Sequence, residues 1–526
     1  MRPDQARAEE QFACSRCTWD FRGRVADAVA KKTGLCDDEC LQHYSELSQP
    51  VMTEQHDQDL KADRSESDHA SLRGSRLINL SLRRKLSKRF PSKSAQRVLL
   101  LQGPVGPFFR KVQALLNQNG FEAWRVCFNA GDRLFARGSQ NLHFSGTAEA
   151  WRDWFTEIVG EHGFDYVVLF GCEREVHRIA MEQCAAVGVP VLCLEEGYIR
   201  PGFVTMELGG NNWRSPVMGK LPAEDDAESK LERPKGASYP SSFGAMATYA
   251  YTYFAVRGVF SRPSERKLFH KPKRSFVREM FYWIKNYYRK FSNLGRNYRS
   301  MERLLEHHDK RYYLVPLQVH DDGQLGAAAG GWSNQKLVLK SIVSFARNAP
   351  ATSQLVFKIH PMERGHSQDS QFIRQVSVLN NVADRVHILD GGSLGLLTRH
   401  SAGMVTINST SGLSALQHGV PLAVLGQAFY RHPTLAHCVN KGIELDQFWS
   451  SGHVAPANLR REYLNWINRK CLQPGDFYAY EGMEVAANSL LAKLRAIDEA
   501  SGSVRPLRLS VDYAPERLRS VGGTPT

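Results

Sequence analysis

Four short segments of the sequence combine residue types that could bind an anion or carry out acid–base chemistry. Each begins with, or directly follows, an apolar run with the composition of a β-strand. In doubly wound sheets, ligands bind beyond the carboxyl ends of the strands. The four segments are Gln102–Phe109, Leu194–Pro201, Phe357–Pro361 and Ile407–Gly412.

The Leu194–Pro201 segment places two carboxylates, Glu195 and Glu196, side by side after a strand-like run. Desolvated like charges repel, so the pKa of one carboxylate should rise, which suits a general base or a nucleophile. Arg200 is close enough in sequence to bind an anionic group of the same ligand. A solvated loop with scattered charges is the competing interpretation.

Cationic and small polar residues mark the two later segments. Lys358 and His360 are two residues apart on a strand, so both could reach the same phosphate. Asn408, Ser409, Thr410 and Ser411 open a helix, where hydroxyl groups and free N–H groups can converge on a phosphate. Helix capping by Ser409 or Thr410 would leave the same trace in the sequence.

In the first segment, Gly103 and Gly106 would let the backbone approach a ligand closely. A plain strand-to-helix turn has the same composition, and the segment is not the dinucleotide-binding fingerprint.

Short apolar runs without alternation, separated by amphipathic helical stretches, predict parallel sheets covered on both faces. One series of runs starts at Arg97 and a second at Tyr312, so we expect two Rossmann-like domains. Expected strands are 97–102, 121–128, 166–170, 189–194, 312–319, 354–359, 386–389, 404–407 and 421–425. Expected helices end near 117 or span 148–159, 175–187, 336–346, 411–417 and 481–498, and the last could cross back to the first domain.

The expected divisions are a polar N-terminal extension (1–95), a Rossmann-like domain (96–215), an insert (216–311), a second Rossmann-like domain (312–475) and a C-terminal helix and tail (476–526). In the extension, two thiol pairs have a spacing that could hold zinc, and a poorly ordered segment is the alternative. They are Cys14 with Cys17 and Cys36 with Cys40.

The insert interleaves basic and aromatic residues over 267–290, and a basic stretch at Arg83–Arg89 could act with it. This composition suits a membrane interface, where rings lie at headgroup depth and cations meet anionic lipid. A solvated helical hairpin and a single-strand nucleic-acid surface are the alternatives. The net charge of +14 fits any polyanionic partner and does not choose among them.

The remaining composition is that of a globular protein without a disulfide framework. Cys127, Cys172, Cys184 and Cys193 lie in or beside apolar runs, so we expect buried thiols. No apolar run is long enough for a transmembrane span and no secretory signal is visible, so we expect a cytoplasmic protein.

Taken in order, the motifs resemble the capsule polysaccharide synthesis family, specifically its KpsS/LipA type of β-Kdo transferase. Single motifs are common, and their order and spacing are specific. Ala130 stands where the family usually has glycine, and the region at 321 is acidic and rich in glycine. The resemblance rests on Leu101–Phe109, Phe128–Asp132, Glu195–Pro201, Val315–His320, Lys358–Met362 and Thr406–Leu416.

The resemblance implies a GT-B fold with two domains facing across a cleft, and transfer of Kdo from CMP-Kdo to a lyso-phosphatidylglycerol-type lipid. Its motif logic is similar to that of bacterial sialyltransferases. Glu195 or Glu196 would be the catalytic carboxylate, and His360 with the Ser409–Ser411 segment would stabilise the phosphate that leaves. Asp132 is a third carboxylate for the acceptor. No metal or cofactor is implied, and a second Kdo transferase and the capsule export complex are implied partners.

Two other functions remain open at this point. The chain could be a non-catalytic capsule export component that binds a glycan or nucleotide. It could also use another nucleotide sugar, since Glu444 or Asp446 could bind a ribose. A nucleic-acid role has no recognisable module behind it, so we expect none.

Overall fold

The structure is a computed structural model that describes residues 95–500, apart from 137, 139, 224–234, 268–275, 321, 366 and 441–443. The predicted extension, its two cysteine pairs, the Arg83–Arg89 stretch and the end of the tail lie outside the described residues. Of the described residues, 95–216, 235–267 and 467–500 form one compact unit, and 217–223 and 277–466 form another. The segment taken as one insert, 216–311, is therefore divided between the two units.

The first unit is built on a seven-stranded sheet, counted over the described residues, in the order β13-β6-β5-β4-β1-β2-β3. Strands β5, β4, β1, β2 and β3 are parallel to their neighbours, whereas β6 runs antiparallel to β5 and β13. The strands are β1 (Gln96–Leu100), β2 (Phe121–Cys127), β3 (Asn141–His143), β4 (Tyr166–Phe170), β5 (Val191–Glu196), β6 (Phe203–Leu208) and β13 (Leu472–Pro474).

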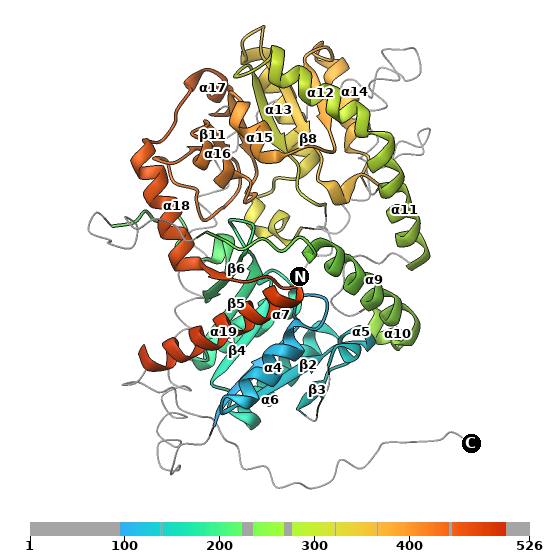
Figure 1. Cartoon of the computed structure of the whole chain (residues 1–526), viewed down its shortest axis with the longest axis vertical. Coiled ribbons are helices and arrows are strands. Elements are labelled where there is room, and N and C mark those ends of the chain that lie inside the picture. Colours follow the sequence, from blue (N-terminus) through green and yellow to red (C-terminus); the bar gives the residue numbers. More distant parts are fainter. Residues whose placement is uncertain are drawn as a thin grey trace, which may run out of the picture. The chain divides into compact units, whose positions relative to one another are not determined.

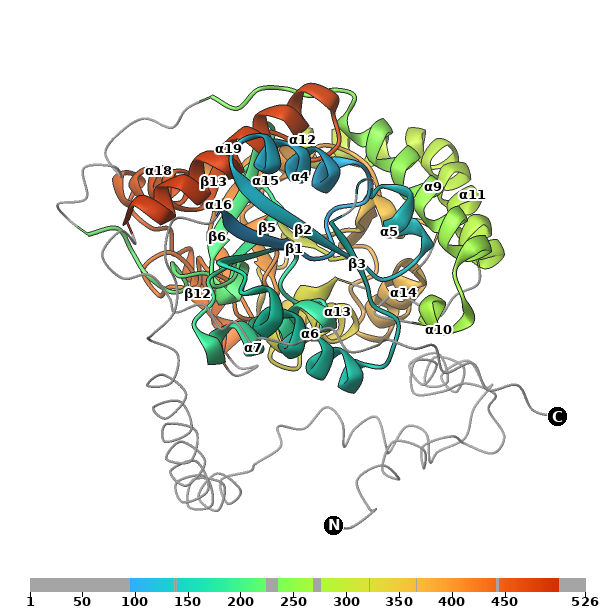
Figure 2. The ribbon, with the colours of Figure 1, turned by 90° about the horizontal axis from the view of Figure 1, so that it is seen from below.

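Helices cover both faces of this sheet, with α4 and α19 on one face and α6 and α7 on the other (Figure 2). The helices of this unit are α4 (Phe108–Gln118), α5 (Ala130–Leu134), α6 (Ala148–His162), α7 (Glu175–Val187), η2 (Asn212–Arg214), α9 (Ser242–Phe260), α10 (Pro263–Lys267) and α19 (Tyr480–Ala500). Local signals set their ends: Thr147 caps the start of α6, and left-handed glycines, Gly163 and Gly188, end α6 and α7.

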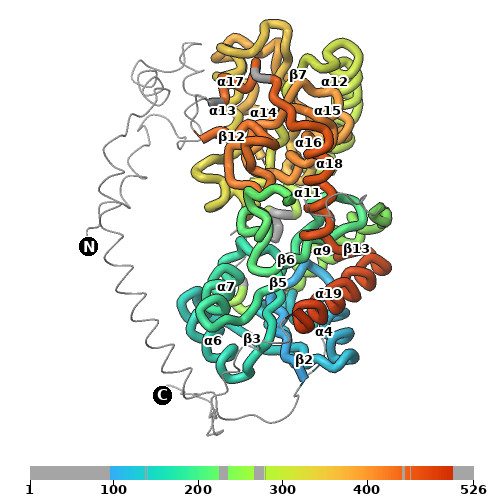
Figure 3. Tube along the Cα trace, turned by 90° about the vertical axis from the view of Figure 1, so that its left-hand side faces the viewer, coloured from blue at the N-terminus to red at the C-terminus, as the bar shows by residue number. Residues whose placement is uncertain are grey.

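The C-terminal helix returns to the first sheet, as expected from the sequence. Helix α19 lies beside α4, although the two are far apart in the chain (Figures 1 and 3). Buried residues of α19, including Ala486, Leu490 and Leu494, join the same cluster as Val98 of β1 and Val112 of α4. This half of the core is therefore completed only when the end of the chain is in place.

The second unit has an all-parallel sheet of six strands, again counted over the described residues, in the order β12-β11-β10-β7-β8-β9. The strands are β7 (Tyr312–Pro316), β8 (Gln354–Lys358), β9 (Val386–Leu389), β10 (Gly403–Thr406), β11 (Leu422–Val424) and β12 (His437–Cys438). The helices are α11 (Phe276–Ser292), α12 (Leu294–His307), η3 (Gly323–Leu325), η4 (Ala327–Ala329), α13 (Asn334–Asn348), η5 (Pro361–Glu363), α14 (Asp369–Leu379), α15 (Leu394–His400), α16 (Gly412–His418), α17 (Glu444–Ser451) and α18 (Ala457–Cys471).

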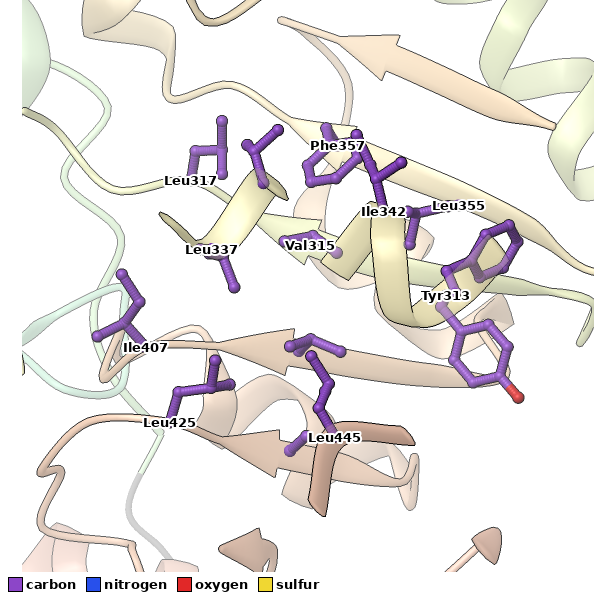
Figure 4. Close-up of a cluster of buried hydrophobic side chains, with 14 of the residues drawn as sticks. Tyr313, Val315, Leu317, Leu337, Ile342, Leu355, Phe357, Ile407, Leu425 and Leu445 are labelled. Atoms are coloured by element: carbon purple, nitrogen blue, oxygen red, sulfur yellow. The ribbon is translucent and has the colours of Figure 1, made fainter. Parts of the chain in front are cut away.

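The core of the second unit joins the sheet to α13 and α17. Side chains of β7, β8, β10 and β11 face those of the two helices (Figure 4). Val315, Phe357 and Ile342 are fully buried there. Because these strands are covered by apolar residues, polar side chains can gather only at the ends of the strands.

The expected α/β class with two Rossmann-like sheets is confirmed. Strands β4 and β9 and helix α7 have the predicted bounds, and the other expected strands and helices are present with ends shifted by a few residues. Strands β3, β6, β12 and β13 were not predicted. Among the described helices, none is both long and apolar enough to cross a membrane.

Candidate functional site

In the first unit, Arg174 connects the ends of neighbouring strands β1 and β4. The Arg174 guanidinium donates to Gln102 Oε1 at 3.0 Å and to the carbonyl oxygen of Gly103 at 3.3 Å. Burial lowers the pKa of Arg174, and the nearby Asp132 and Glu195 oppose this shift. A half-buried cation thus stands at the edge where the sequence predicts ligand binding.

Asp132 is 4% exposed and lies inside a hydrogen-bond network that fastens α9 to the sheet. Its Oδ1 accepts from Tyr253 Oη at 3.2 Å and from Gln102 Nε2 at 3.4 Å. Its Oδ2 accepts from Asn129 Nδ2 and from the Phe128 backbone N–H, both at 3.0 Å. Burial raises the pKa of Asp132, while these donors lower it. An acceptor-binding role for Asp132 stays a prediction, and any such role would act from within this network.

The glycines of the first segment make room for the protein's own aromatic rings. A Cβ on Gly103 would lie 2.8 Å from the Phe109 ring, and one on Gly106 would lie 2.7 Å from the Tyr249 ring of α9. Gly106 also has φ +112°, which disfavours any side chain. The structure thus explains both glycines by packing, and their role in donor binding stays a prediction.

The two adjacent carboxylates lie on opposite faces of β5. Side chains alternate along a strand, and Leu194 packs in the cluster with α4 and α19 while Cys193 packs in the cluster with α6 and α7. Glu196 therefore belongs to the α19 face and Glu195 to the α7 face. The expectation that they follow the strand and repel one another is wrong in its geometry, because β5 extends through both and separates them.

Each carboxylate has its own surroundings. Glu196 forms an ion pair with Arg200 at 3.7 Å and accepts a hydrogen bond from the Tyr478 hydroxyl. Burial, followed by the Glu196 charge, holds the pKa of Tyr478 well above its usual value. The Glu195 charge instead acts on Arg174 and on buried Tyr198.

A buried polar network lies beneath the acidic motif and was not predicted. The Tyr198 hydroxyl donates to Glu207 Oε2 at 2.7 Å and accepts from the Asn212 backbone N–H. The Ser215 hydroxyl also donates to Glu207, whose pKa is raised by burial and lowered by these bonds. These hydrogen bonds connect the loop after β5 to β6 and so hold the end of the acidic motif in place.

The expected buried thiols are confirmed. Cys127, Cys172, Cys184 and Cys193 are buried and unpaired with another cysteine. Burial raises the pKa of Cys127 and of Cys184 to about 12, which makes both poor nucleophiles.

In the second unit, Lys358 and His360 lie at the end of β8. Lys358 is 6% exposed, and burial, with the nearby Arg364, lowers its pKa to about 8. His360 Nδ1 accepts from the Met362 backbone N–H at 3.2 Å. A neutral His360 therefore carries its proton on Nε2, from where it can donate to a ligand.

Helix α11 holds the loop that follows β8. The buried Asn286 donates through Nδ2 to the carbonyl oxygens of Pro361 at 3.1 Å and Met362 at 2.9 Å. A Cβ on Gly365 would lie 2.2 Å from the Tyr282 carbonyl oxygen, so this loop and the helix backbone are in direct contact. The position of His360 thus depends on a helix that precedes the sheet in sequence.

The Asn408–Ser411 segment leads from β10 into α16, which begins at Gly412. The capping residue is Ser411, and its side chain makes no capping hydrogen bond. Ser409 Oγ accepts only within the turn, from the Ser411 backbone N–H at 3.3 Å. Helix capping by Ser409 or Thr410 is therefore wrong as an account of these residues.

The predicted residues fall into two groups, one at each sheet. The first unit holds Gly103, Gly106, Asp132, Glu195, Glu196 and Arg200, and the second holds Lys358, His360, Asn408, Ser409, Thr410 and Ser411. Arg174, Tyr253, Tyr478 and Asn286 were missed. Arg174 follows the end of β4, so the strand-end rule could have found it, whereas the other three reach the site from distant segments.

The predicted absence of a metal rests on the resemblance. Within the part of the chain that the structure describes, no three His, Cys, Asp or Glu side chains form a metal-binding group. The thiol pairs at Cys14, Cys17, Cys36 and Cys40 lie outside that part.

Replacement of Gly106 by alanine should destabilise the first unit by about 2–4 kcal/mol, because positive φ and the Tyr249 ring both oppose a Cβ. Gly120→Ala is the matched control, since Gly120 has φ +83° and no neighbouring atom within 4 Å of its Cβ position. It should lose about 1–2 kcal/mol. Urea unfolding measures both, and equal losses would contradict the packing of α9 on this turn.

Comparison with known proteins places the chain in a family. The model of the capsule polysaccharide biosynthesis protein family matches residues 165–478. The capsule polysaccharide export protein KpsS of Escherichia coli is 33% identical over 377 residues, covering 71% of this chain and 95% of that protein. The capsule polysaccharide modification protein LipB of Neisseria meningitidis serogroup A is 31% identical over 405 residues, covering 73% and 92%.

Similarity to solved structures is weaker. The β-Kdo 2,7 transferase KpsC of Thermosulfurimonas dismutans is 14% identical with a TM-score of 0.32, covering 72% of this chain and 99% of that one. A UDP-N-acetylglucosamine 2-epimerase from Listeria monocytogenes is 13% identical with a TM-score of 0.30, covering 80% and 100%. Scores this low carry no argument about activity. The sequence motifs indicated a KpsS/LipA type, whereas these two relatives are KpsS and LipB. The chain belongs to the capsule polysaccharide biosynthesis protein family.

Proposed function

We propose that this chain is a GT-B-type glycosyltransferase that moves Kdo from CMP-Kdo to a (lyso)phosphatidylglycerol-type lipid and so starts a capsule linker. The observation that carries the proposal is the buried Lys358 at the end of β8, with His360 two residues later. A buried ammonium is costly unless an anion balances it. Its neighbour Asp390 raises the Lys358 pKa, but burial and Arg364 outweigh this effect.

In this proposal Lys358 and His360 bind the phosphate of the nucleotide. When the bond to the anomeric carbon breaks, negative charge grows on that phosphate. The Lys358 ammonium and the His360 Nε2–H stabilise it, since donors positioned in advance need no reorganisation during the reaction. Ser409, Thr410 and Ser411, which follow strand β10 on the other side of β7, supply further donors.

In this proposal a carboxylate of β5 acts on the anomeric carbon of the sugar. The family resemblance implies that the β configuration of the donor is kept, which permits a double displacement. In its first step one carboxylate attacks the anomeric carbon, CMP leaves, and a glycosyl-enzyme intermediate forms. The acceptor hydroxyl then displaces the carboxylate. Glu195 and Glu196 are on opposite faces of β5 and cannot share this role, so one is the nucleophile or base and the other has a different function.

A different nucleotide sugar is the second candidate donor, and one observation weakens it. Asp446, proposed as a ribose-binding carboxylate, accepts a hydrogen bond from the Ser344 hydroxyl, which also accepts from Trp449 Nε1 at 2.7 Å. These bonds join α13 to α17. The side chain of Glu444 lies outside the described residues.

A non-catalytic role in capsule export is the other alternative, since the Escherichia coli relative KpsS is called a capsule polysaccharide export protein. This role predicts nucleotide or glycan binding without turnover. We also propose a second Kdo transferase and the export complex as partners, with no role for nucleic acid.

We further propose that the enzyme is cytoplasmic and docks on the inner face of the cytoplasmic membrane through α11. Opposite the buried Asn286, this helix exposes apolar and aromatic side chains. The exposed fractions are Phe281 64%, Ile284 57%, Tyr287 52%, Tyr288 72% and Phe291 66%. Lys285 and Lys290 are exposed on the same helix. Rings with adjacent cations suit an anionic bilayer surface, where a lipid acceptor would be found.

Transfer should depend on one β5 carboxylate. We expect Glu195→Gln or Glu196→Gln to lower the rate at least 100-fold, because an amide is neither a nucleophile nor a base. His360→Ala should also lower the rate. Mass spectrometry of a fluorescent lyso-phosphatidylglycerol incubated with CMP-Kdo, generated in situ, measures the added sugar. Glu182→Gln, an exposed carboxylate of the same unit, is the control and should keep full activity; unchanged rates in both β5 variants would contradict the mechanism.

CMP binding should weaken as the pH rises through about 8, the pKa of Lys358. Above that pH the side chain loses its proton and its charge, so the affinity should fall by up to about ten-fold per pH unit. Lys358→Arg remains charged and should give a flat profile from pH 7 to 9.5. Calorimetry at several pH values makes the comparison, and equal slopes for the two proteins would show that Lys358 does not bind the phosphate.

Binding to phosphatidylglycerol vesicles should fall about ten-fold or more when glutamate replaces Phe281 or Tyr288. Each change removes a ring that the bilayer would bury and adds a negative charge that the anionic lipid repels. Val378→Glu, at a position 51% exposed on α14 of the same unit, is the control. Sedimentation with the vesicles measures binding. If the α11 variants sediment like wild type, α11 is not the docking surface.

A further inference from the structure

Four oxygens at the ends of the adjacent strands β7 and β10 have no hydrogen-bond partner among the described residues. They are Gln318 Oε1, Gln324 Oε1, Asn408 Oδ1 and Ser411 Oγ. The first three belong to side chains that are almost fully buried, with 7%, 6% and 0% exposure respectively. Buried polar atoms are usually satisfied, so several unpartnered acceptors in one cluster favour a site for a hydrogen-bond donor.

Hydrogen bonds join Gln318, Gln324 and Asn408, with Asp322, into one cluster. Asn408 Nδ2 donates to the carbonyl oxygen of Gln324 at 2.8 Å. The Gln324 backbone N–H donates to Asp322 Oδ1 at 3.0 Å, and Gln318 Nε2 donates to Asp322 Oδ2 at 3.3 Å. The cluster therefore has a fixed arrangement before any ligand arrives.

The same bonds fix which end of each amide is available. A carbonyl or carboxylate oxygen can only accept, so the groups facing them must be the NH₂ ends of Asn408 and Gln318. The available atoms are then Asn408 Oδ1 and Gln318 Oε1, and both are acceptors. A phosphate oxygen of a nucleotide sugar has no proton to give, so these two atoms do not suit a phosphate. They require an O–H or N–H donor.

Resting on the proposed function, we propose that Gln318 and Asn408, held in place through the Gln324 backbone and Asp322, bind the nucleoside of the donor through its ribose hydroxyls or the exocyclic amine of its base. Strand β7 lies between β10 and β8 in the sheet. The cluster is therefore next to Lys358 and His360, which bind the phosphate in the same proposal. Asn408 thus belongs with the nucleoside rather than with the phosphate.

The test is calorimetric titration of the full chain with CMP, 2′-deoxy-CMP, UMP and inorganic phosphate. Gln318→Met and Asn408→Leu keep the number of side-chain heavy atoms and remove both the acceptor and the donor of the amide. Gln113→Met is the matched control, because Gln113 is also buried with an unpaired Oε1 but lies in the other unit, between α4 and β2.

We expect Gln318→Met and Asn408→Leu to weaken CMP binding at least ten-fold and to leave phosphate binding unchanged, while Gln113→Met binds both like wild type. If wild type binds 2′-deoxy-CMP more weakly than CMP and a variant binds the two equally, the substituted residue contacts the ribose 2′-hydroxyl. If the same pattern appears with UMP in place of 2′-deoxy-CMP, the residue contacts the amine of the base.

CMP binding by both variants at wild-type affinity overturns the nucleoside cluster and leaves the proposed function standing. If wild type binds neither CMP nor UMP, both the cluster and the proposed function fail. If Asn408→Leu does not fold, as judged by thermal unfolding, Gln318→Met decides the question.

Discussion

Burial of the parallel strands on both faces is the constraint on which the rest of the structure depends. Strands β1 and β4 are covered by apolar side chains from helices on either side, and every residue of β7 and β8 is buried, so their backbone groups are satisfied within the sheet. Polar and charged side chains therefore gather where these strands end, and a buried one within a strand, such as Glu207 of β6, needs its own hydrogen-bond partners. In each unit this constraint brings together residues that are far apart in sequence, such as Gln102 with Arg174 and Gln324 with Asn408.

In each unit, a segment from outside the alternating strands and helices contributes a side chain to the polar residues at the strand ends. In the first unit, α9 contributes Tyr253 to the network around Asp132, and the returning end of the chain contributes Tyr478 to Glu196. In the second unit, α11 contributes Asn286 to the loop that carries His360. The face of α11 opposite Asn286 is exposed and aromatic, so one helix combines the support of the site with the surface proposed for the membrane.

The sequence was sufficient for the two sheets because their strands are continuous apolar runs, and this signal does not depend on tertiary contacts. It was also sufficient to place the candidate residues at strand ends. Strand β6 was missed because Thr205 and Glu207 interrupt its apolar pattern, and Glu207 can be buried only because Tyr198 and Ser215 donate to it. Such partners become visible only in three dimensions.

The acidic motif shows the same limit more sharply. Adjacency in sequence predicted repulsion between Glu195 and Glu196, yet the alternation of a strand that extends further than expected puts them on opposite faces. In the same way, hydroxyl residues before α16 suggested a cap or a phosphate site, whereas the orientation of Asn408 depends on its bond to Gln324. The sequence was sufficient to show which residue types lie at the strand ends. It was not sufficient to show the direction in which each side chain points.

The most direct test of the central claim is the stoichiometry of the wild-type reaction. CMP release from CMP-Kdo and formation of Kdo-lipid are measured in the same sample, with and without lyso-phosphatidylglycerol. We expect CMP release beyond one equivalent per enzyme to require the lipid and to equal the Kdo-lipid formed, one for one. CMP-Kdo that binds but releases no CMP with the lipid present would contradict it and favour a non-catalytic role in capsule export.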